Sequence, residues 1–245
     1  MSHFSINIKP FGRHAIQVEW PNEVQESILT DILQFESHLK KHFLSTPDWE
    51  TVPAYNSLML VHRDAPVEFN AWEERLRKAY ADRTALAKVE RTLWKIPVCY
   101  GDAFALDLEA VAHSLNMTPQ ELVAQHSGRT YTVYGIGFLP GFMYLGGLPS
   151  SLELPRRSEP RPKVPKGAVG LAGKQTGIYP QESPGGWHII GRTFVPLFDA
   201  SRKEPCFVSV GDKVQFTPIS KSAFELHAIE VEVGIYNMQK SVWDD

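Results

Sequence analysis

The residues best suited to chemistry or recognition lie between Tyr131 and Asp199. This stretch holds 12 of the 17 glycines and 9 of the 18 prolines, so we predict tight turns and short strands there. Its large apolar residues, such as Phe142 and Ile178, indicate an ordered region and not a flexible linker. Ordered loops carry function more often than strands do. The polar and aromatic residues of interest are Arg156, Arg157, Arg161, Lys163, Lys166, Gln175, Tyr179, Trp187, His188 and Arg192.

The three arginines of this stretch are candidates for binding an anion. Arg156, Arg157 and Arg161 alternate with prolines, which limit how far the loop can move. The planar guanidinium group matches the oxygens of a carboxylate or a phosphate. Solvated surface charge, with nearby glutamates as local partners, is an alternative of equal weight from the sequence alone.

Trp187 and His188 follow a Ser-Pro-Gly-Gly turn. Such a turn can present an aromatic ring and an imidazole at a loop tip, where both can serve a binding site. The alternative is a core tryptophan beside a surface histidine, and for His188 that is the more common outcome.

The familiar nucleotide and metal motifs are absent from the sequence. The glycine-rich run 167–176 invites a phosphate-loop interpretation, but the position five residues before Gly173 is Ala168. The residue after Lys174 is Gln175, so the hydroxyl that would bind magnesium is also missing. No H-E-x-x-H, G-x-S-x-G or C-x-x-C pattern occurs. We therefore assign no catalytic residue and predict no metal site.

Composition places the chain among ordinary globular proteins. It has 245 residues, of which 43% are hydrophobic and 22% charged, and its formal net charge of −3 argues against broad nucleic-acid binding. The uncharged stretch 130–152 is long enough to span a bilayer, but its glycines and prolines predict buried strands and loops. With no apolar secretory segment at the start, we expect a cytoplasmic protein that contacts neither nucleic acid nor membrane.

The first 85 residues are predicted to form a small α+β domain, 1–85, with one sheet and helices on one face. Asn22 is expected to cap the first helix, with Gln25 in a capping-box arrangement. The polar segment 82–91 lacks strand alternation and is the predicted domain boundary. Apolar periodicity predicts strands at 5–9, 14–20, 49–55 and 57–62, and helices at 23–43 and 65–81.

The remainder, 92–240, is predicted to be a second and mostly β domain. Thr118, Pro119 and Glu121 give a helix start with a capping box, and Gly128 lies just past its end. We expect a strand at 92–100, a short helix at 106–115, short strands from 129 to 218, a hairpin turn at 211–212 and a last strand at 224–236.

Three long motifs now identify a family resemblance. The segments GFLPGFMYLGGLP, LPRRSEPRPKVPKGAVGLAGKQTGIYP and SPGGWHIIGRT occur in order and closely resemble the family of the B-type subunit of 5-oxoprolinase. This family is also called allophanate hydrolase subunit 1, or the KipI kinase-inhibitor family. The resemblance is strongest over 92–217, and VPAYNSLMLVH in the first domain is compatible with it. The opening departs from the pattern with Gly12–Arg13, where relatives often have Gly-Asp.

The resemblance implies a ferredoxin-like first domain and a cyclophilin-like β-barrel second domain. It also implies two partners in a 5-oxoprolinase complex: the C-type subunit, which is also called allophanate hydrolase subunit 2, and the A-type subunit. In this family, the resemblance implies, the three subunits together open 5-oxoproline to L-glutamate with ATP. Because no nucleotide motif is present, we expect ATP with magnesium at a site shared within the complex, and no cofactor held tightly by the isolated chain.

Two other functions remain open from the sequence. One is inhibition of a sensor histidine kinase, as in KipI members of the family. The other is half of a biotin-dependent carboxyltransferase in an allophanate–urea system, because related paired domains occur there. The chain has no biotin-carrier or amidase signature, which lowers the weight of this last function.

Within this framework the arginine-containing loop is predicted to bind a substrate carboxylate, a phosphate or an acidic partner surface. The prolines and glycines expected to shape the loops around it are Pro140, Gly141, Gly177, Gly185 and Gly186. The residues expected to line one concavity with the arginines Arg156, Arg157 and Arg161 are Gln175, Tyr179, Trp187, His188 and Arg192.

Overall fold

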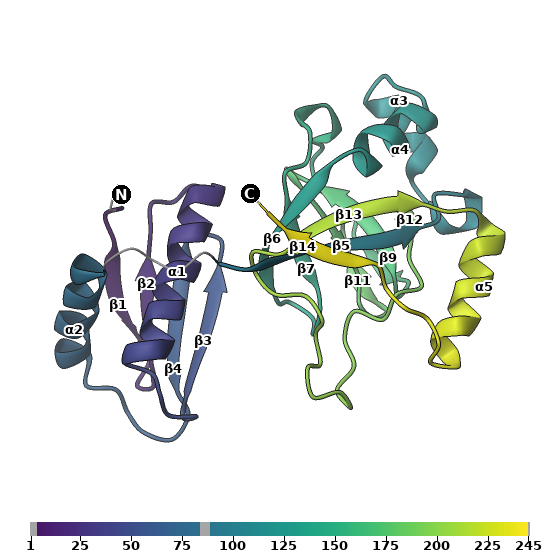
Figure 1. Cartoon of the computed structure of the whole chain (residues 1–245). Helices are drawn as coiled ribbons and strands as arrows, with labels where there is room; N and C mark the ends of the chain where they lie inside the picture. The colour runs from purple at the N-terminus through teal and green to yellow at the C-terminus, as the bar shows by residue number, and fades with distance from the viewer. Residues whose placement is uncertain (1–3, 84–88, 245) are drawn as a thin grey trace. The chain divides into compact units, whose positions relative to one another are not determined.

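The structure, a computed structural model, describes residues 4–83 and 89–244, and the chain divides into two compact units, Met1–Glu90 and Arg91–Asp245 (Figure 1). Residues 84–88 of the predicted boundary lie outside the described residues. The helices are α1 Glu26–His42, α2 Phe69–Asp82, α3 Leu108–Ser114, α4 Pro119–Ser127 and α5 Lys221–Glu232, with short 3₁₀ turns at η1 Asp102–Phe104 and η2 Ser150–Leu152.

The strands are β1 Asn7–Phe11, β2 Ala15–Glu19, β3 Trp49–Ala54, β4 Ser57–His62, β5 Arg91–Val98, β6 Thr130–Ile136, β7 Met143–Gly146, β8 Arg161–Val164, β9 Ala168–Ala172, β10 Gln175–Ile178, β11 Ser183–Gly185, β12 His188–Arg192, β13 Lys213–Pro218 and β14 Lys240–Trp243.

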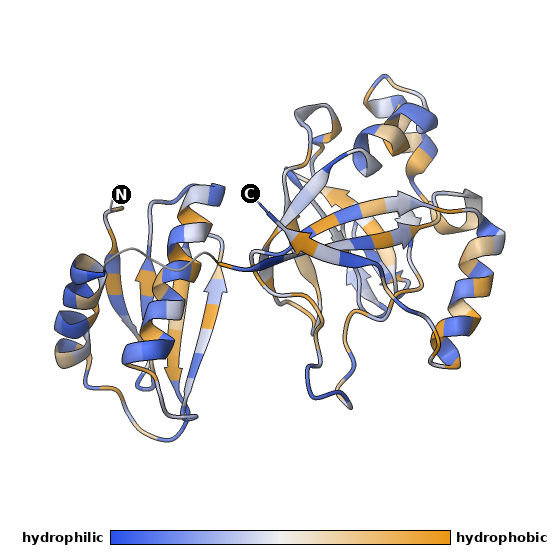
Figure 2. Ribbon diagram, viewed as in Figure 1, coloured by the Kyte–Doolittle hydropathy of each residue, from blue (hydrophilic) through white to orange (hydrophobic). Residues whose placement is uncertain are grey.

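The smaller unit is an antiparallel sheet with two helices. Its strands lie in the order β1-β2-β4-β3, and every neighbouring pair is antiparallel. The apolar stripe of α1 packs on inward-facing residues of β2 and β4. Figure 2 shows hydrophobic and hydrophilic residues alternating along these elements. The buried residues of this core include Ile16, Val18, Ile28, Ile32, Phe35, Leu39, Leu58 and Leu60.

The element order of the smaller unit is β-β-α-β-β-α, whereas a ferredoxin-like domain runs β-α-β-β-α-β. Moving the first strand to the end of the chain converts one order into the other. The unit therefore has the element content of a ferredoxin-like domain, with its first strand at the opposite end of the chain.

The larger unit is built on a mixed sheet of eight strands in the order β12-β9-β10-β7-β6-β13-β5-β14. β13 and β5 run parallel, and the other ladders of this sheet are antiparallel. A second, two-stranded sheet pairs β11 with β8. The strand ladders among the described residues leave the large sheet open, so they do not form the closed barrel that the resemblance implies. A single isolated bridge joins Cys99, after β5, to Arg192 at the end of β12.

The uncharged stretch 130–152 folds as predicted, into β6, β7 and a short 3₁₀ turn. Tyr131, Val133, Met143 and Leu145 on these strands are fully buried. None of the described helices is both long enough and apolar enough to cross a membrane.

The predicted cap of the first helix is wrong. α1 begins at Glu26, three residues later than expected from Asn22, and Gln25 at its N-cap makes no side-chain capping bond. The α4 cap is confirmed: Thr118 Oγ1 accepts from the backbone N–H of Glu121, and the Glu121 side chain accepts from the N–H of Thr118.

The predicted hairpin at 211–212 is also wrong. β13 follows this turn but pairs with β5 and β6, which come from distant parts of the chain. The Asp212 carboxylate gives the physical reason that β13 pairs with β5 in place of a hairpin strand. It accepts from the backbone N–H groups of Thr92 and Ser209 and from Trp94 Nε1, each at 2.9 Å. The turn is thereby tied to β5 rather than to a preceding hairpin strand.

The last predicted strand, 224–236, is a helix over most of its length. In α5, Ser220 Oγ accepts from the N–H of Ala223, so a serine N-cap starts the helix. The alternation of apolar and acidic residues in 229–233 resembles a strand pattern, but Ala, Leu and Glu in 223–230 favour a helix.

Candidate functional site

Residues 155–161, called here the arginine loop, are held at two points against the turn that contains Gly185 and Gly186. Arg161 begins β8 and pairs with Gly185 of β11. The N–H of Arg157 donates to the carbonyl oxygen of Gly186 at 2.9 Å. Because both ends of the loop are bonded to the same turn, its arginines are held in place before any ligand arrives.

A buried carboxylate from outside the loop binds two of its three arginines. Arg161 donates from Nη1 to Asp107 Oδ2 at 2.9 Å and from Nη2 to Oδ1 at 2.5 Å, a bidentate pair. Arg157 donates from Nη1 to Asp107 Oδ1 at 3.2 Å. The backbone N–H of Ile189 donates to Oδ2 at 2.6 Å. Since Asp107 precedes α3 and Ile189 lies on β12, this one carboxylate joins the arginine loop to both elements.

Arg156 differs from the other two arginines. Its side chain is exposed, and no carboxylate of the described residues forms an ion pair with it. Arg157 and Arg161, in contrast, are partly buried against Asp107, whose side chain is 6% exposed. Of the three arginines, Arg156 is therefore the one whose guanidinium group is available for a ligand.

An aromatic cluster lies under this region. Phe142 makes edge-to-face contacts with Tyr144, Tyr179 and Trp187, with ring centroids 4.9, 5.4 and 5.5 Å away. Tyr179 and Trp187 are buried in a small core with Ile189, separate from the main core of the larger unit. The structure thus places Tyr179 and Trp187 in packing roles, which was the alternative interpretation for Trp187.

The Tyr179 hydroxyl lies where the aromatic cluster meets the arginines. Burial raises the pKa of Tyr179, while a hydrogen bond from the Trp187 backbone and the positive charges of Arg156 and Arg161 act to lower this pKa. These opposing effects place Tyr179, Arg156 and Arg161 in one electrostatic neighbourhood. With Arg157, Asp107 and Trp187 they form the group that we call the arginine–tyrosine site.

Two of the loop-shaping glycines are required by close approach. A Cβ atom added to Gly185 would lie 2.3 Å from the Tyr179 hydroxyl oxygen. Gly141 has a φ of +82°, and a Cβ there would lie 2.9 Å from the carbonyl oxygen of Leu197. Both positions therefore allow neighbouring chain to approach in a way that a larger residue would prevent.

Gly177 is a third glycine required by close approach, because a Cβ there would lie 2.9 Å from the Met143 carbonyl oxygen. A Cβ on Gly186 would have only ordinary contacts, the nearest at 3.7 Å. Pro140 is exposed in the turn before Gly141.

Gln175, His188 and Arg192 do not converge on one point. In the β9 ladders, Gln175 pairs with Ala172 and His188 with Leu171, at one end of β9. Arg192 pairs with Ala168, at the opposite end of that strand. His188 Nε2 bonds to the Pro155 carbonyl oxygen at 3.0 Å, so His188 contacts the arginine loop.

The Arg192 side chain binds a backbone carbonyl group and does not reach the arginine loop. Its Nε donates to the Lys166 carbonyl oxygen at 2.8 Å. Four residues of strand, about 13 Å, separate it from His188. The expected single concavity is therefore divided, with His188 beside the arginine loop and Arg192 at the other end of β9.

The sequence reasoning missed Asp107, which falls within the helix predicted at 106–115 and directly precedes α3 in the structure. It also missed His126, which is fully buried in α4. Tyr100 Oη lies 2.8 Å from His126 Nδ1, and Thr176 Oγ1 lies 2.9 Å from His126 Nε2. Burial lowers the pKa of His126 to about 3, so the imidazole is neutral at physiological pH.

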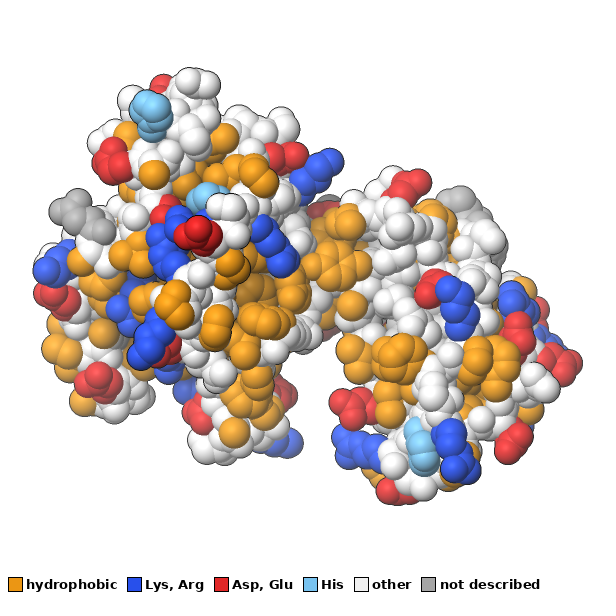
Figure 3. Space-filling model, turned by 180° about the vertical axis from the view of Figure 1, so that it is seen from behind, with side chains coloured by type: hydrophobic (Ala, Val, Ile, Leu, Met, Phe, Trp, Pro, Cys, Tyr) orange, Lys and Arg blue, Asp and Glu red, His pale blue; other side chains and the backbone are white. Residues whose placement is uncertain are grey.

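The chemistry that the arginine–tyrosine site can perform is recognition of an anion. It offers one exposed guanidinium group and two that Asp107 fixes, with the buried Tyr179 phenol beneath them. Figure 3 shows Lys and Arg side chains close together beside hydrophobic side chains on the larger unit. Over residues 4–83 and 89–244, no group of three or more His, Cys, Asp or Glu side chains is placed to hold a metal ion.

Comparison with known proteins gives a consistent result. The family described as carboxyltransferase domain, subdomain C and D, matches residues 6–208. The B-type subunit of 5-oxoprolinase from Bacillus subtilis is 34% identical over 236 residues, which cover 92% of this chain and 97% of that protein. The B-type subunit of 5-oxoprolinase from Haemophilus influenzae is 44% identical over 167 residues, which cover 68% of this chain and 78% of that protein.

Larger proteins also match part of this chain. The urea amidolyase of Saccharomyces cerevisiae is 27% identical over 186 residues, which cover 64% of this chain and 10% of that protein. Among solved structures, that of the protein TTHA0988 superposes with a TM-score of 0.71 at 33% identity. The match covers 84% of this chain and 40% of the TTHA0988 chain.

Proposed function

The chain belongs to the carboxyltransferase-domain family that includes the B-type subunit of 5-oxoprolinase, and from that premise we propose that it acts as this subunit in an ATP-dependent 5-oxoprolinase. In this proposal it works with the C-type and A-type subunits to open 5-oxoproline to L-glutamate. The observation that carries the proposal is the match to the Bacillus subtilis protein over 97% of that protein's length.

The other two functions have less support. Urea amidolyase matches over 10% of its length, so a carboxyltransferase role rests on one part of a much larger protein. No described feature of the chain favours inhibition of a histidine kinase over participation in the enzyme. Reconstitution separates these functions directly.

The isolated chain is expected to form no glutamate from 5-oxoproline and ATP, whereas a mixture with the A-type and C-type subunits is expected to be active. Glutamate release in the complete mixture, and in mixtures that each omit one protein, is the measurement. Full activity without this chain would contradict the proposal, and inhibition of a histidine kinase by the chain would then support the KipI-type alternative. Full activity of the chain alone would contradict the need for partners.

The described residues do not fit a complete site for ATP with magnesium. The sequence lacks a phosphate loop, and the described residues offer no cluster of metal-binding side chains. Arg157 and Arg161 are already bound to Asp107, which leaves Arg156 as the available guanidinium group of the loop. We therefore propose that partner residues complete any nucleotide site, and we assign no reaction step to ATP on this chain.

Within the complex, the arginine–tyrosine site is proposed to hold a carboxylate, a phosphate or an acidic surface of the partner. Arg156 would contact the anion, and Asp107 would keep Arg157 and Arg161 in position. His188 supports the loop through the Pro155 carbonyl oxygen. The buried Tyr179 supports the site from beneath, beside the charges of Arg156 and Arg161.

Arg156→Lys is expected to lower the turnover of the reconstituted complex by roughly ten- to a hundredfold, because a charge-assisted bond contributes about 1.5–3 kcal/mol. Lysine keeps the charge but loses the planar pair of donors. The melting temperature should stay at the wild-type value, because Arg156 is exposed. Turnover and melting temperature are measured on the same preparations.

Two controls separate binding from folding. Arg129→Lys changes another exposed arginine, between α4 and β6, and is expected to leave turnover unchanged. Arg161→Lys is expected to lower the melting temperature, because it disrupts the bidentate pair with Asp107. Wild-type turnover of Arg156→Lys in an intact complex would remove Arg156 from the site.

We further propose that the two units are independent domains, 1–85 and 92–240, and that the second curls toward a cyclophilin-like barrel. Support comes from the bridge near the sheet edges, where Cys99 and Arg192 exchange backbone hydrogen bonds of 2.9 and 3.0 Å. A cytoplasmic location is proposed for the complex. Both cysteines are free thiols, as expected in a reducing compartment.

A further inference from the structure

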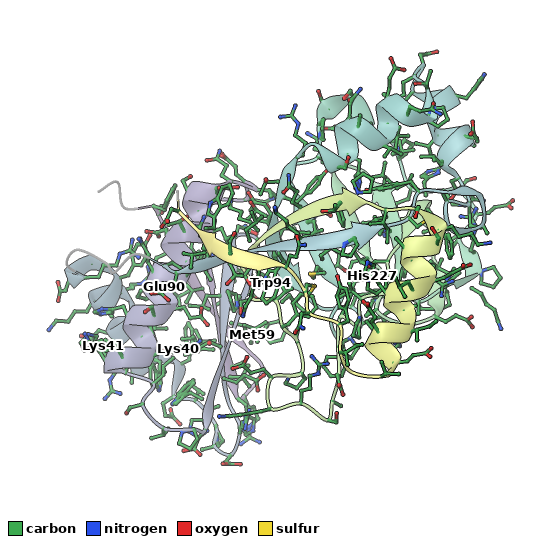
Figure 4. All side chains as sticks on the ribbon, turned by 45° about the vertical axis from the view of Figure 1, so that its right-hand side comes forward. Lys40, Lys41, Met59, Glu90, Trp94 and His227 are labelled. Atoms are coloured by element: carbon green, nitrogen blue, oxygen red, sulfur yellow. The ribbon has the colours of Figure 1, made fainter. Side chains whose placement is uncertain are left out.

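A cavity lies in the larger unit, lined by residues that are not part of the arginine–tyrosine site. Its volume is about 300 Å³, and its walls come from β5, from the segment 195–207 and from the segment 231–240, which runs from the end of α5 to the start of β14. Trp94 on β5 and His227 on α5 are labelled in Figure 4 and show where these elements lie. Segment 231–240 is beyond the residues 6–208 that match the family, so part of this cavity is built from sequence that the family match does not cover.

The apolar wall of this cavity is aromatic and held in place. Trp94 and Phe207 meet edge to face, with ring centroids 4.8 Å apart, and Met238 lines the same cavity. The Trp94 indole donates from Nε1 to the buried Asp212 carboxylate at 2.9 Å. A fixed indole beside a phenyl ring and a thioether provides a surface against which a flat ring packs well.

The charge at this cavity is positive. Among its described lining residues, the charged side chains are Arg202 and Lys240. Lys240 Nζ lies 5.1 Å from the centre of the Trp94 ring, so a cation stands directly above the aromatic wall. Arg202 Nε pairs with Asp199 at 3.0 Å, which leaves its remaining N–H groups as donors.

A neighbouring cavity shares two polar lining residues with this one, Tyr236 and Asn237. On the far side, His227 and Glu230 are paired with each other at 2.6 Å. The one carboxylate of that neighbouring cavity, among its described lining residues, is therefore already engaged, and Asn237 adds an uncharged amide that can donate to or accept from a ligand.

We propose that this cavity binds a small planar carboxylate, with its ring against Trp94 and Phe207 and its carboxylate facing Lys240 and Arg202. The lining of this cavity combines aromatic and aliphatic side chains with convergent polar groups, as small-molecule sites do, and its volume suits a metabolite-sized ligand. The proposal is independent of the 5-oxoprolinase function, because it needs neither a partner nor turnover.

The test uses benzoate as the probe and the full-length chain as the receptor. The indole N–H signal of Trp94 is followed by NMR during the titration and is assigned with Trp94→Phe. Benzoate is expected to shift this signal saturably. Benzyl alcohol, which has the same ring without the charge, is expected to bind at least roughly tenfold more weakly, because it cannot form charge-assisted bonds.

Variants then test the two cations. Lys240→Gln and Arg202→Gln are each expected to weaken benzoate binding by roughly three- to tenfold, and the double variant by more. Lys221→Gln, on α5 but outside the cavity, is the matched control and should bind like the wild type. The proposal is overturned by a titration without a saturable shift, by equal binding of benzyl alcohol, or by unchanged binding in the double variant.

Discussion

Asp107→Asn is expected to destabilise the larger unit by about 3 kcal/mol, the lower end of the cost of removing one partner from a buried ion pair. The substitution keeps the size of the side chain but removes the charge that Arg157 and Arg161 share. It also places an amide NH₂ group among four donors that need acceptors. The lower end applies because both guanidinium groups keep some contact with water.

Urea denaturation, followed by tryptophan fluorescence and circular dichroism, measures this loss. Glu182→Gln is the control, since Glu182 pairs with Lys163 of β8 at 3.5 Å while both side chains are exposed. An exposed pair of this kind contributes about 0–1 kcal/mol. If the midpoints of both variants were equally close to wild type, Asp107 would not be what holds the arginine loop.

The same variant connects stability with the proposed function. Without the Asp107 carboxylate, Arg157 and Arg161 lose the bonds that fix their side chains. The loop then keeps its backbone bonds and the His188 contact, but Arg156 is held less firmly beside Tyr179. Reconstituted Asp107→Asn should therefore lose turnover even at temperatures where the chain remains folded. Arg156→Lys should lose turnover with no loss of stability, and the two variants together distinguish positioning from contact.

Lowering the pH from 7 to 5 is expected to destabilise the larger unit by about 2 kcal/mol through His126. In the folded chain burial lowers the pKa of His126 to about 3, against an ordinary value of 6.5. The unfolded chain therefore takes up a proton below about pH 6.5 that the folded chain refuses. The stabilising contribution is complete above pH 6.5 and decreases progressively as the pH falls toward 3.

The groups around His126 do not offset this effect. Tyr100 and Tyr131 face the imidazole, and burial raises the pKa of both phenols, so they stay neutral throughout this range. Phe216 stacks on the ring at 4.5 Å and supplies no acceptor for a second proton. A protonated imidazole would therefore be buried without a carboxylate partner among the described residues that contact it.

His126→Gln tests the assignment. The glutamine variant is expected to be less stable at pH 7 but to lose less stability between pH 7 and pH 5 than the wild type, because position 126 then carries no group that titrates in this range. His188→Gln is the control, since His188 is partly exposed and bonds to a backbone carbonyl oxygen. Equal pH slopes for the wild type and His126→Gln would show that another group controls the acid sensitivity.

Local signals in the sequence were sufficient where a structure depends on neighbouring residues. The capping box at Thr118 and Glu121 predicted the start of α4, because both capping partners lie within one helical turn. Apolar alternation predicted β3 and β4 nearly to the residue, because period-two patterning reports directly which face is buried. In α5, apolar alternation predicted a strand, but a serine cap and helix-forming residues favour the helix that is observed.

The sequence alone determined the family, through three long motifs in order, and it marked the arginine loop as a place for recognition. Only the tertiary structure decided which arginine is available. Asp107 lies 54 residues before Arg161, and its carboxylate reaches that guanidinium group because α3 and β12 bring them together. No local pattern encodes such a contact, since the free energy that forms it comes from packing the sheet, the helix and the loop at once.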